Sequence, residues 1–292
     1  MSKQINILLF LIAIVSLSQA ANLIRLAQAP VEVIGFWRLL FASCIMLSLA
    51  WKQQKKPWPK NIPLKAKTAT VLSGCFFFAH LWSYFYSAQN TTIANSMIIF
   101  SANPLFTAVF GAFIFKEKLP GRLVFAYILA FSGLYLLLAQ RIRFDELSNL
   151  GNWSALVSAA FYSGYILSGN RARQDLPNLS YTWLVYLIAA ILFFLTGTIR
   201  HISWTTYPQI TWFAILGTVI FPTLLGHALI TYLLKFININ WLSCGKLTEP
   251  AMSAFIAYLL FSEIPSKETY LAFALTGAAI LILFVPWKNN FK

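Results

Sequence analysis

The sequence predicts an all-α integral membrane protein of ten transmembrane helices, arranged as two inverted five-helix repeats. Three observations carry this prediction: the apolar composition, the spacing of the apolar runs and a motif that occurs twice. Hydrophobic residues make up 59% of the 292 residues, charged residues make up only 10%, and the mean hydropathy is +0.70. Soluble domains are about 45–50% apolar and about 25% charged. The composition therefore excludes an ordinary soluble protein.

The apolar runs have the length of membrane spans, since a helix needs about 20 mostly apolar residues to cross a bilayer. The connections between them are short, and several contain prolines or glycines that favour turns. The ten expected spans are 5–26, 31–51, 67–88, 93–115, 121–140, 152–170, 181–199, 210–234, 239–262 and 268–287.

The first run has an alternative interpretation as a secretory signal peptide. ILLFLIAIVSLSQA followed by Ala21 ends in small residues like a cleavage site, although only Lys3 supplies charge before it. The segment at 13–25 can be aligned with the segment at 156–168, and removal of the first run would leave the two halves unequal. The repeat therefore favours a retained first span.

The basic residues set the orientation. The chain has 22 Lys and Arg against 8 Asp and Glu, for a net charge of +14. These residues lie between apolar runs and not on a hydrophilic domain, so no nucleic-acid partner is expected. With the N-terminus inside, 15 basic residues fall on the cytoplasmic side and 5 outside. Positive charge collects in cytoplasmic loops, so the sequence predicts a multi-pass protein of the cell inner (cytoplasmic) membrane with both termini cytoplasmic.

A motif of proline, apolar run and glutamate occurs in SANPLFTAVFGAFIFKEKL and again in LTEPAMSAFIAYLLFSEIP. Pro104 and Pro250 are separated by 146 residues, and so are Glu117 and Glu263. This distance corresponds to five spans. Because five is odd, the second copy crosses the membrane in the opposite sense.

Such an inverted-topology repeat is typical of secondary transporters. It divides the chain into two expected domains, a first five-helix repeat at 1–145 and a second at 146–292.

Pro104 and Pro250 are expected to break their helices in mid-span. A proline lacks the backbone N–H and frees a carbonyl one turn earlier. In lipid that carbonyl needs a partner helix, water or a ligand. Two breaks at matching depth therefore indicate a central binding site, and a plain structural kink is the alternative for each proline.

Three segments resemble the EamA type of the drug/metabolite transporter superfamily: WRLLFA in the second span, NPLFTAVFGAFIFKEKL in the fourth and LTEPAMSAFIAYLLFSEI in the ninth. The resemblance extends over essentially the whole chain. It implies a central cavity formed by spans one to four and six to nine, with spans five and ten at the periphery. Proteins of this type move amino acids, other small metabolites and drugs, often outward. The resemblance names no substrate.

Ionisable residues inside a span cost about 3 kcal/mol or more, so each needs a partner or a use. Five such residues are the first candidates for the site: Arg38, His80, His227, Lys246 and Glu249.

Lys246 and Glu249 are three residues apart and share a helix face. Lys246 could bind a substrate carboxylate and Glu249 an amino group, or Glu249 could carry a proton. A mutually neutralised pair that only holds the helix is the alternative. The resemblance implies an acidic residue before Pro250, whereas Lys246 is not typical of the family. Asn103 is the first-repeat equivalent of Glu249, so the pseudo-symmetry is broken at the centre.

The remaining candidates can be read either as lining the cavity or as structural. His80 and Tyr84 are four residues apart, and a histidine titrates near neutral pH. His227 can be read in the same way. Arg38 matches a basic residue of the family and could bind an anionic group or clamp backbone carbonyls. Tyr84 and Trp183 could stack on a planar ligand or a cation.

We expect a secondary transporter that exports small polar metabolites, foremost amino acids, by alternating access at a midplane site. An importer or exchanger of a nucleoside- or cofactor-like metabolite or an organic cation is the alternative, and an intramembrane lipid-modifying enzyme is a remote one. The chain has no GxxxxGK[ST] loop and no HExxH motif, so no enzyme activity, cofactor or metal is expected.

Coupling to protons through Glu249 or a histidine is left open. The expected partners are a small-molecule substrate and the lipid bilayer, and a homodimer is left open as well.

Overall fold

The structure, a computed structural model, describes residues 3–54, 61–115, 121–139, 147–239, 242, 246, 249–265 and 267–284, and its elements in this part of the chain are helices. Glu117 of the repeated motif lies outside the described residues. The helices are α1 (Lys3–Leu17), α2 (Ala20–Ala27), α3 (Val31–Gln54), α4 (Leu64–Asn90), α5 (Ile93–Phe100), α6 (Asn103–Phe115), α7 (Gly121–Ala139), α8 (Leu147–Asp175), α9 (Asn178–Ile199), α10 (Gln209–Thr218), the π-helix η1 (Val219–His227), α11 (Ala228–Leu233), α13 (Glu249–Phe261) and α14 (Lys267–Phe284).

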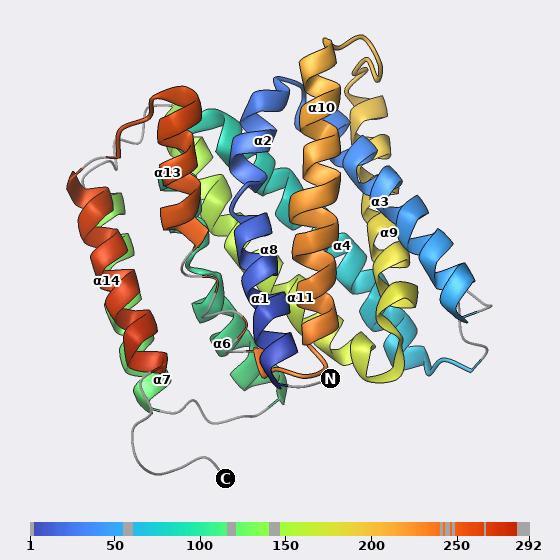
Figure 1. Cartoon of the computed structure of the whole chain (residues 1–292), viewed down its shortest axis with the longest axis horizontal. Coiled ribbons are helices and arrows are strands. Elements are labelled where there is room, and N and C mark those ends of the chain that lie inside the picture. The colour runs from blue at the N-terminus through green and yellow to red at the C-terminus, as the bar shows by residue number, and fades with distance from the viewer. Residues whose placement is uncertain are drawn as a thin grey trace.

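The helices stand side by side in one bundle, with the start of α1 and the end of α14 at the same end of it (Figure 1). Glu32 at the start of α3 pairs with Arg200, which follows the end of α9. These two helices are therefore antiparallel neighbours. We call the end of the bundle that holds Glu32 and Arg200 the far end.

Among the described residues, five helical stretches are long and apolar enough to cross a membrane by themselves, so the chain is a multi-pass membrane protein. Three of these five contain an interruption: α1 gives way to α2, α5 to α6, and α10 to η1 and α11. The five stretches are Gln4–Ala27, Val31–Gln53, Ile93–Ile114, Asn178–Ile199 and Gln209–Leu233.

Helices α4 and α8 correspond to the expected spans 67–88 and 152–170, yet neither is apolar enough to be counted among those five. They are the longest helices described, with 27 and 29 residues, and they pack against each other. Ser73 of α4, for example, donates a hydrogen bond to the carbonyl of Tyr165 on α8. Polar side chains on these two helices are shielded from lipid because each helix covers the other.

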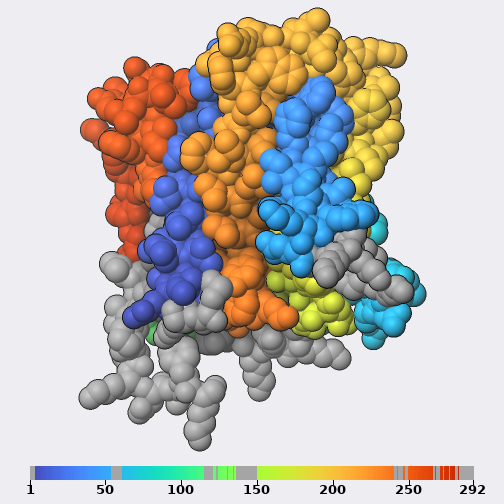
Figure 2. All heavy atoms as spheres, turned by 45° about the vertical axis from the view of Figure 1, so that its right-hand side comes forward, coloured from blue at the N-terminus to red at the C-terminus, as the bar shows by residue number. Residues whose placement is uncertain are grey.

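The other helices surround this central pair. Helices α7 and α14 pack on each other at one edge of the bundle, and α3 and α9 lie at the opposite edge (Figure 1). Figure 2 shows α10 and η1 filling one face between α1 and α3. The principal packing pairs are α4 with α8, α3 with α9, α7 with α14, α4 with α9, α1 with η1, α2 with α10, α6 with α8, α5 with α8, and α5 with α13.

Small and large apolar residues divide between the inside and the outside. Buried alanines such as Ala21, Ala159 and Ala189 allow the helices to approach closely. Large apolar side chains such as Phe113 and Leu259 are exposed. Exposed apolar surface is normal for a protein whose solvent is the bilayer hydrocarbon.

Candidate functional site

Nine polar side chains from distant parts of the sequence meet inside the bundle. They come from α3, α4, α6, α8, η1 and α13 and from the turn before α13, and none is more than 4% exposed. We call them the central polar cluster: Arg38, His80, Tyr84, Asn103, Tyr162, Tyr165, His227, Lys246 and Glu249. Seven of the eight side chains that the sequence singled out as substrate ligands belong to it.

Aromatic rings hold the middle of the central polar cluster. The ring centroid of His80 lies 5.0 Å from that of Tyr162, 5.2 Å from that of Phe100 and 6.0 Å from that of His227. His227 in turn makes an edge contact with Phe77 at 4.9 Å. Lys246 lies over the rings of Tyr162 and Phe100. Arg38 lies over the ring of Phe85, which is next to that of Tyr84.

His80 is held by Ser158 of α8. The Ser158 hydroxyl donates to the backbone carbonyl of His80 at 3.0 Å, and its oxygen lies 2.8 Å from His80 Nδ1. Because the hydroxyl proton is used in the first bond, Nδ1 must carry the hydrogen in the second. The other ring nitrogen, Nε2, is then an acceptor.

Lys246 and Glu249 form an ion pair, with 3.6 Å between Nζ and Oε1. Nζ also lies 3.8 Å from the centroid of the Tyr162 ring and 5.3 Å from that of Phe100, in the geometry of a cation–π contact. A distance of 3.6 Å is too long for a hydrogen bond. Glu249 Oε1 consequently has no hydrogen-bond partner among the described residues.

Arg38 is a fully buried charge, with no exposed surface. Its Nε donates to Thr223 Oγ1 at 2.6 Å, and its guanidinium carbon lies 5.3 Å from the centroid of the Phe85 ring. Its two terminal nitrogens have no hydrogen-bond partner in the described part of the chain. Buried charges normally have paired donors, so these nitrogens are available to an anionic group.

The π-helix η1 places both His227 and Thr223. Pro222 within it cannot donate to the carbonyl of Thr218, one turn earlier. The Thr223 hydroxyl donates to that carbonyl instead, at 2.7 Å, and its oxygen accepts from Arg38. Single π-turns are frequent at functional sites. The sequence analysis missed Thr223, and the adjacent proline in the eighth span is the signal that could have found it.

The helix break at Pro104 is satisfied within the chain. The missing N–H frees the carbonyl of Phe100, and the side-chain amide of Asn103 donates to it at 2.9 Å. The Asn103 carbonyl itself accepts from Thr107 and Ser163, both at 2.9 Å. What remains for a ligand is the Asn103 side-chain oxygen, which is buried and has no partner among the described residues.

Two other candidates make contacts outside the central polar cluster. The Tyr84 hydroxyl donates to Met97 Sδ at 2.8 Å, so only its ring, 5.9 Å from that of His80, faces the central polar cluster. Trp183 is half-buried on α9, and its carbonyl accepts from Ser43 of α3 at 2.8 Å. Trp183 therefore belongs to the contact between α3 and α9.

Unpartnered polar atoms are concentrated in this one region. Buried polar groups in proteins are almost always hydrogen-bonded, and exceptions mark a bound water, an ion or a function. Within the described residues, the unpartnered atoms of the central polar cluster are Arg38 Nη1 and Nη2, Asn103 Oδ1, the hydroxyls of Tyr162 and Tyr165, His227 Nδ1 and Glu249 Oε1. They include donors and acceptors and both signs of charge, which suits a small polar molecule.

A multi-pass helical bundle with a buried polar site of this kind is typical of small-molecule transporters. The EamA-like transporter family matches residues 4–139 and, a second time, residues 149–285. The chain belongs to this family, which confirms the resemblance found in the sequence. The family points to a transporter rather than an enzyme.

Two relatives bear transporter names. An uncharacterized transporter, PA0485 of Pseudomonas aeruginosa, is 25% identical over 269 residues, which are 89% of this chain and 86% of that protein. The uncharacterized transporter YyaM of Bacillus subtilis is 24% identical over 258 residues, 85% of this chain and 81% of that protein. A solved crystal structure with 18% identity superposes with a TM-score of 0.75 over 97% of this chain and 98% of its own, which shows the fold.

Proposed function

We propose that the protein is a secondary transporter of small zwitterionic metabolites, amino acids foremost, which binds its substrate at the central polar cluster and exports it by alternating access. One observation carries the proposal. Within this one buried cluster, Arg38 has two donor nitrogens and Glu249 has a carboxylate oxygen that make no hydrogen bond to the described residues. A carboxylate and an ammonium are the groups that complement them.

Tyr84 lies between the two charged groups: its ring centroid is 6.4 Å from that of Phe85, which Arg38 contacts, and 5.2 Å from that of Phe100, which Lys246 contacts. The substrate carboxylate would bind Arg38, the ammonium would bind Glu249, and the side chain would rest on the rings of His80 and Tyr162. Lys246 partly balances Glu249, so the carboxylate of Glu249 holds an ammonium reversibly. Reversible binding suits a site that must release what it binds.

The charge balance favours a substrate with an anionic group. Lys246 and Glu249 cancel, and Arg38 has no acid beside it in the described part of the chain. An organic cation would meet an uncompensated positive charge in a region of low dielectric, where such repulsion is strong. We therefore rank a zwitterion above the organic cation and the nucleoside-like substrate that the sequence left open.

The packing pattern supports ten transmembrane helices in two inverted five-helix repeats. In such a repeat, each of the first five expected spans has an equivalent among the last five. The equivalent of α4 is α10–η1–α11, and the equivalent of α8 is α1–α2. These equivalents pack together, as α4 and α8 do. In three further packed pairs the two helices are equivalents of each other: α3 with α9, α5 with α13, and α7 with α14. A two-fold pseudo-symmetry would produce this pattern.

Two arginines occupy equivalent places in the two halves of the chain. Arg25 in the last turn of α2 donates to the carbonyls of Ala88 and Thr91 at the end of α4. Arg173 in the last turn of α8 donates to the carbonyl of Thr231 on α11, at 3.0 Å. Arg25 lies at the far end and Arg173 beside the start of α9, at the opposite end, as an inverted repeat requires. With the charge bias of the loops, this supports an inner-membrane protein with both termini cytoplasmic.

The test is counterflow uptake into proteoliposomes with a panel of labelled amino acids, amines and nucleosides. We expect uptake of an amino-acid group by the wild type. We expect Arg38→Lys to lower uptake about tenfold or more, since lysine cannot form the bidentate contact, and Glu249→Gln to abolish it. Asp175→Asn is the control, because Asp175 forms an exposed ion pair with Arg171 at the other end of α8.

Uptake of amines alone, or undiminished amino-acid uptake by folded Arg38→Lys and Glu249→Gln proteins, would disprove the proposed site. Coupling to protons and a homodimer stay predictions from the sequence.

A further inference from the structure

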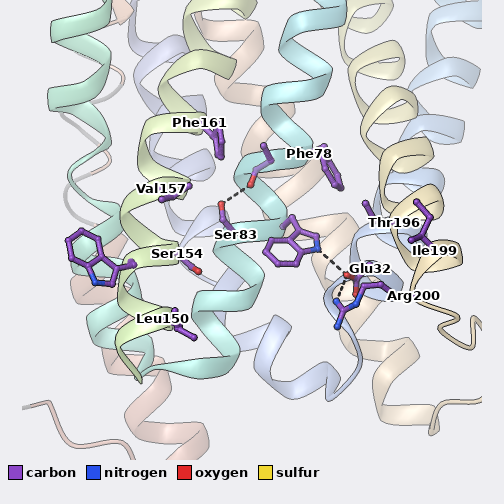
Figure 3. Close-up of a pocket in the computed structure, with 13 residues that line it drawn as sticks. Glu32, Phe78, Ser83, Leu150, Ser154, Val157, Phe161, Thr196, Ile199 and Arg200 are labelled. Carbon is purple, nitrogen blue, oxygen red and sulfur yellow. Dashed lines mark hydrogen bonds and ion pairs between the residues drawn. The ribbon is translucent and has the colours of Figure 1, made fainter. Parts of the chain in front are cut away.

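A cavity lies between α4, α8 and α9, separate from the central polar cluster. We call it the lateral groove; its volume is about 520 Å³. Figure 3 shows Phe161, Val157 and Leu150 following one another along α8, with Phe78 on the side of α4 that faces α9. Leu150 is 55% exposed and Val157 45%. In a membrane-spanning bundle these side chains face lipid, so the lateral groove opens sideways to the bilayer.

The length of the lateral groove matches one leaflet. Leu150 and Phe161 are eleven residues apart on α8, which corresponds to about 17 Å along a helix. The hydrocarbon core of a bilayer is about 30 Å thick. The apolar walls therefore extend for about the reach of one acyl chain.

One end of the lateral groove is charged. Glu32 Oε1 accepts hydrogen bonds from Trp82 Nε1 at 3.0 Å and from Arg200 Nη1 at 2.6 Å (Figure 3). The Glu32 side chain has no exposed surface, whereas the Arg200 side chain is 59% exposed. Arg200 covers Glu32 from the water side and is free to swing outward.

Glu32 keeps an unused acceptor at this end. Its second oxygen, Oε2, is buried and has no hydrogen-bond partner among the described residues. A carboxylate that served only to pair with Arg200 would gain from a two-pronged contact, which arginine is well shaped to make. The free oxygen and the exposed guanidinium together offer a negative and a positive group at the mouth of an apolar slot.

We propose that the lateral groove binds a phospholipid with a primary-amine headgroup. One acyl chain lies along α8, the ammonium donates to Glu32 Oε2, and the phosphate contacts Arg200. The negative Glu32 and the positive Arg200 thus complement the ammonium and the phosphate of the zwitterionic headgroup. A quaternary amine has no N–H to donate, and an anionic headgroup has no ammonium, so both fit less well. This site is independent of the proposed transport site.

Native mass spectrometry of the delipidated full chain tests the proposal. The protein is mixed with equal amounts of phosphatidylethanolamine, phosphatidylcholine and phosphatidylglycerol that carry the same acyl chains. We expect the ethanolamine lipid to be retained about tenfold more than either of the others, the difference that one charge-assisted hydrogen bond makes. Glu32→Gln should remove this preference and leave the choline lipid unchanged.

If Glu32→Gln does not fold, Ser154→Phe provides a second test of the proposal. Ser154 lines the lateral groove, so the phenyl ring should fill it and lower retention of the ethanolamine lipid. Asp175→Asn and Ile191→Phe are the matched controls, since Asp175 forms a different ion pair and Ile191 is an exposed residue of α9 outside the lateral groove. Equal retention of the three lipids by the wild type, preference for the glycerol lipid, or unchanged selectivity in folded Glu32→Gln or Ser154→Phe would each overturn the proposal.

Discussion

At the scale of single residues, Lys246 and Glu249 raise the question of whether a buried ion pair serves binding or only holds a helix. The pair has almost no exposed surface, and its 3.6 Å separation leaves Glu249 Oε1 unpartnered among the described residues. A pair that only neutralised itself would be expected to close to hydrogen-bonding distance. The open geometry favours a role in binding.

A double-mutant cycle separates the two roles. Lys246→Met alone should lower the free energy of unfolding by about 3–5 kcal/mol, because it leaves a buried charge unpaired. Lys246→Met combined with Glu249→Gln should recover most of that loss. We expect transport to stay abolished in the double variant, since the acceptor for the ammonium is gone. Thermal unfolding in detergent and counterflow uptake are the two measurements, and recovery of transport together with stability would mean that the pair is only structural.

The sequence revealed all the charged members of the central polar cluster but only some of the neutral ones. Arg38 and Glu249 stood out because a charge inside a span is costly and therefore rare. Threonine is ordinary in membrane helices, so nothing in the sequence alone marked Thr223. The carbonyl freed by Pro104 was expected to await a partner helix, water or a ligand, and the neighbouring Asn103 amide satisfies it instead.

At the scale of the helix, η1 determines the direction of His227 and Thr223. Pro222→Ala should allow the α-helical hydrogen bond from residue 222 to the Thr218 carbonyl and let η1 return towards an α-helix. Because successive residues of an α-helix are about 100° apart, losing the extra residue of a π-turn would rotate Thr223 away from Arg38. We expect unfolding temperatures equal to or above the wild type and strongly reduced uptake.

Pro208→Ala is the control for Pro222→Ala, since Pro208 precedes α10 and lies outside η1. Undiminished uptake by Pro222→Ala would show that the π-helix has no part in the site.

Helices α4 and α9 approach each other closely at Gly74. A Cβ added to Gly74 of α4 would lie 2.7 Å from the Ile188 side chain of α9. Gly74→Ala should therefore destabilise the protein by about 1–3 kcal/mol through overpacking. Gly277→Ala on α14 is the matched control, because no described atom lies within 4 Å of its added Cβ. It should be neutral or stabilise by up to about 1 kcal/mol through helix propensity.

Thermal unfolding of both glycine variants makes the comparison. Equal melting temperatures for Gly74→Ala and Gly277→Ala would contradict the close contact between α4 and α9.

The positions of the helical spans could be predicted from the sequence more readily than the packing between them. Ten apolar runs predicted ten spans, whereas only five stretches of the described chain are apolar enough to cross alone. The polar side chains of α4 and α8 are tolerated because the two helices cover each other. Such shielding depends on packing between distant segments, which a reading of one run at a time does not contain.

At the scale of the whole molecule, an ion pair at the far end ties the two halves of the chain together. Arg25 of α2 pairs with Glu263, just after α13, and also donates to backbone carbonyls at the end of α4. The second oxygen of Glu263 accepts from the backbone N–H of Ile93 at 3.1 Å, at the start of α5. Helices from both repeats thus converge on one pair of side chains, which closes the far end above the central polar cluster.

If the bundle works by alternating access, breaking this pair should expose its interior from the far end. Ser253 is fully buried on α13, so Ser253→Cys in a background free of other cysteines reports access to a water-soluble maleimide. We expect Arg25→Gln to speed labelling several-fold in membrane vesicles, because α13 is no longer held to α2 and α4. Arg171→Gln, which breaks an exposed ion pair at the other end, should leave the labelling rate unchanged. Equal rates in the two variants would mean that the Arg25–Glu263 pair stabilises the fold without controlling access, and the closure at this end would then have to depend on helix packing alone.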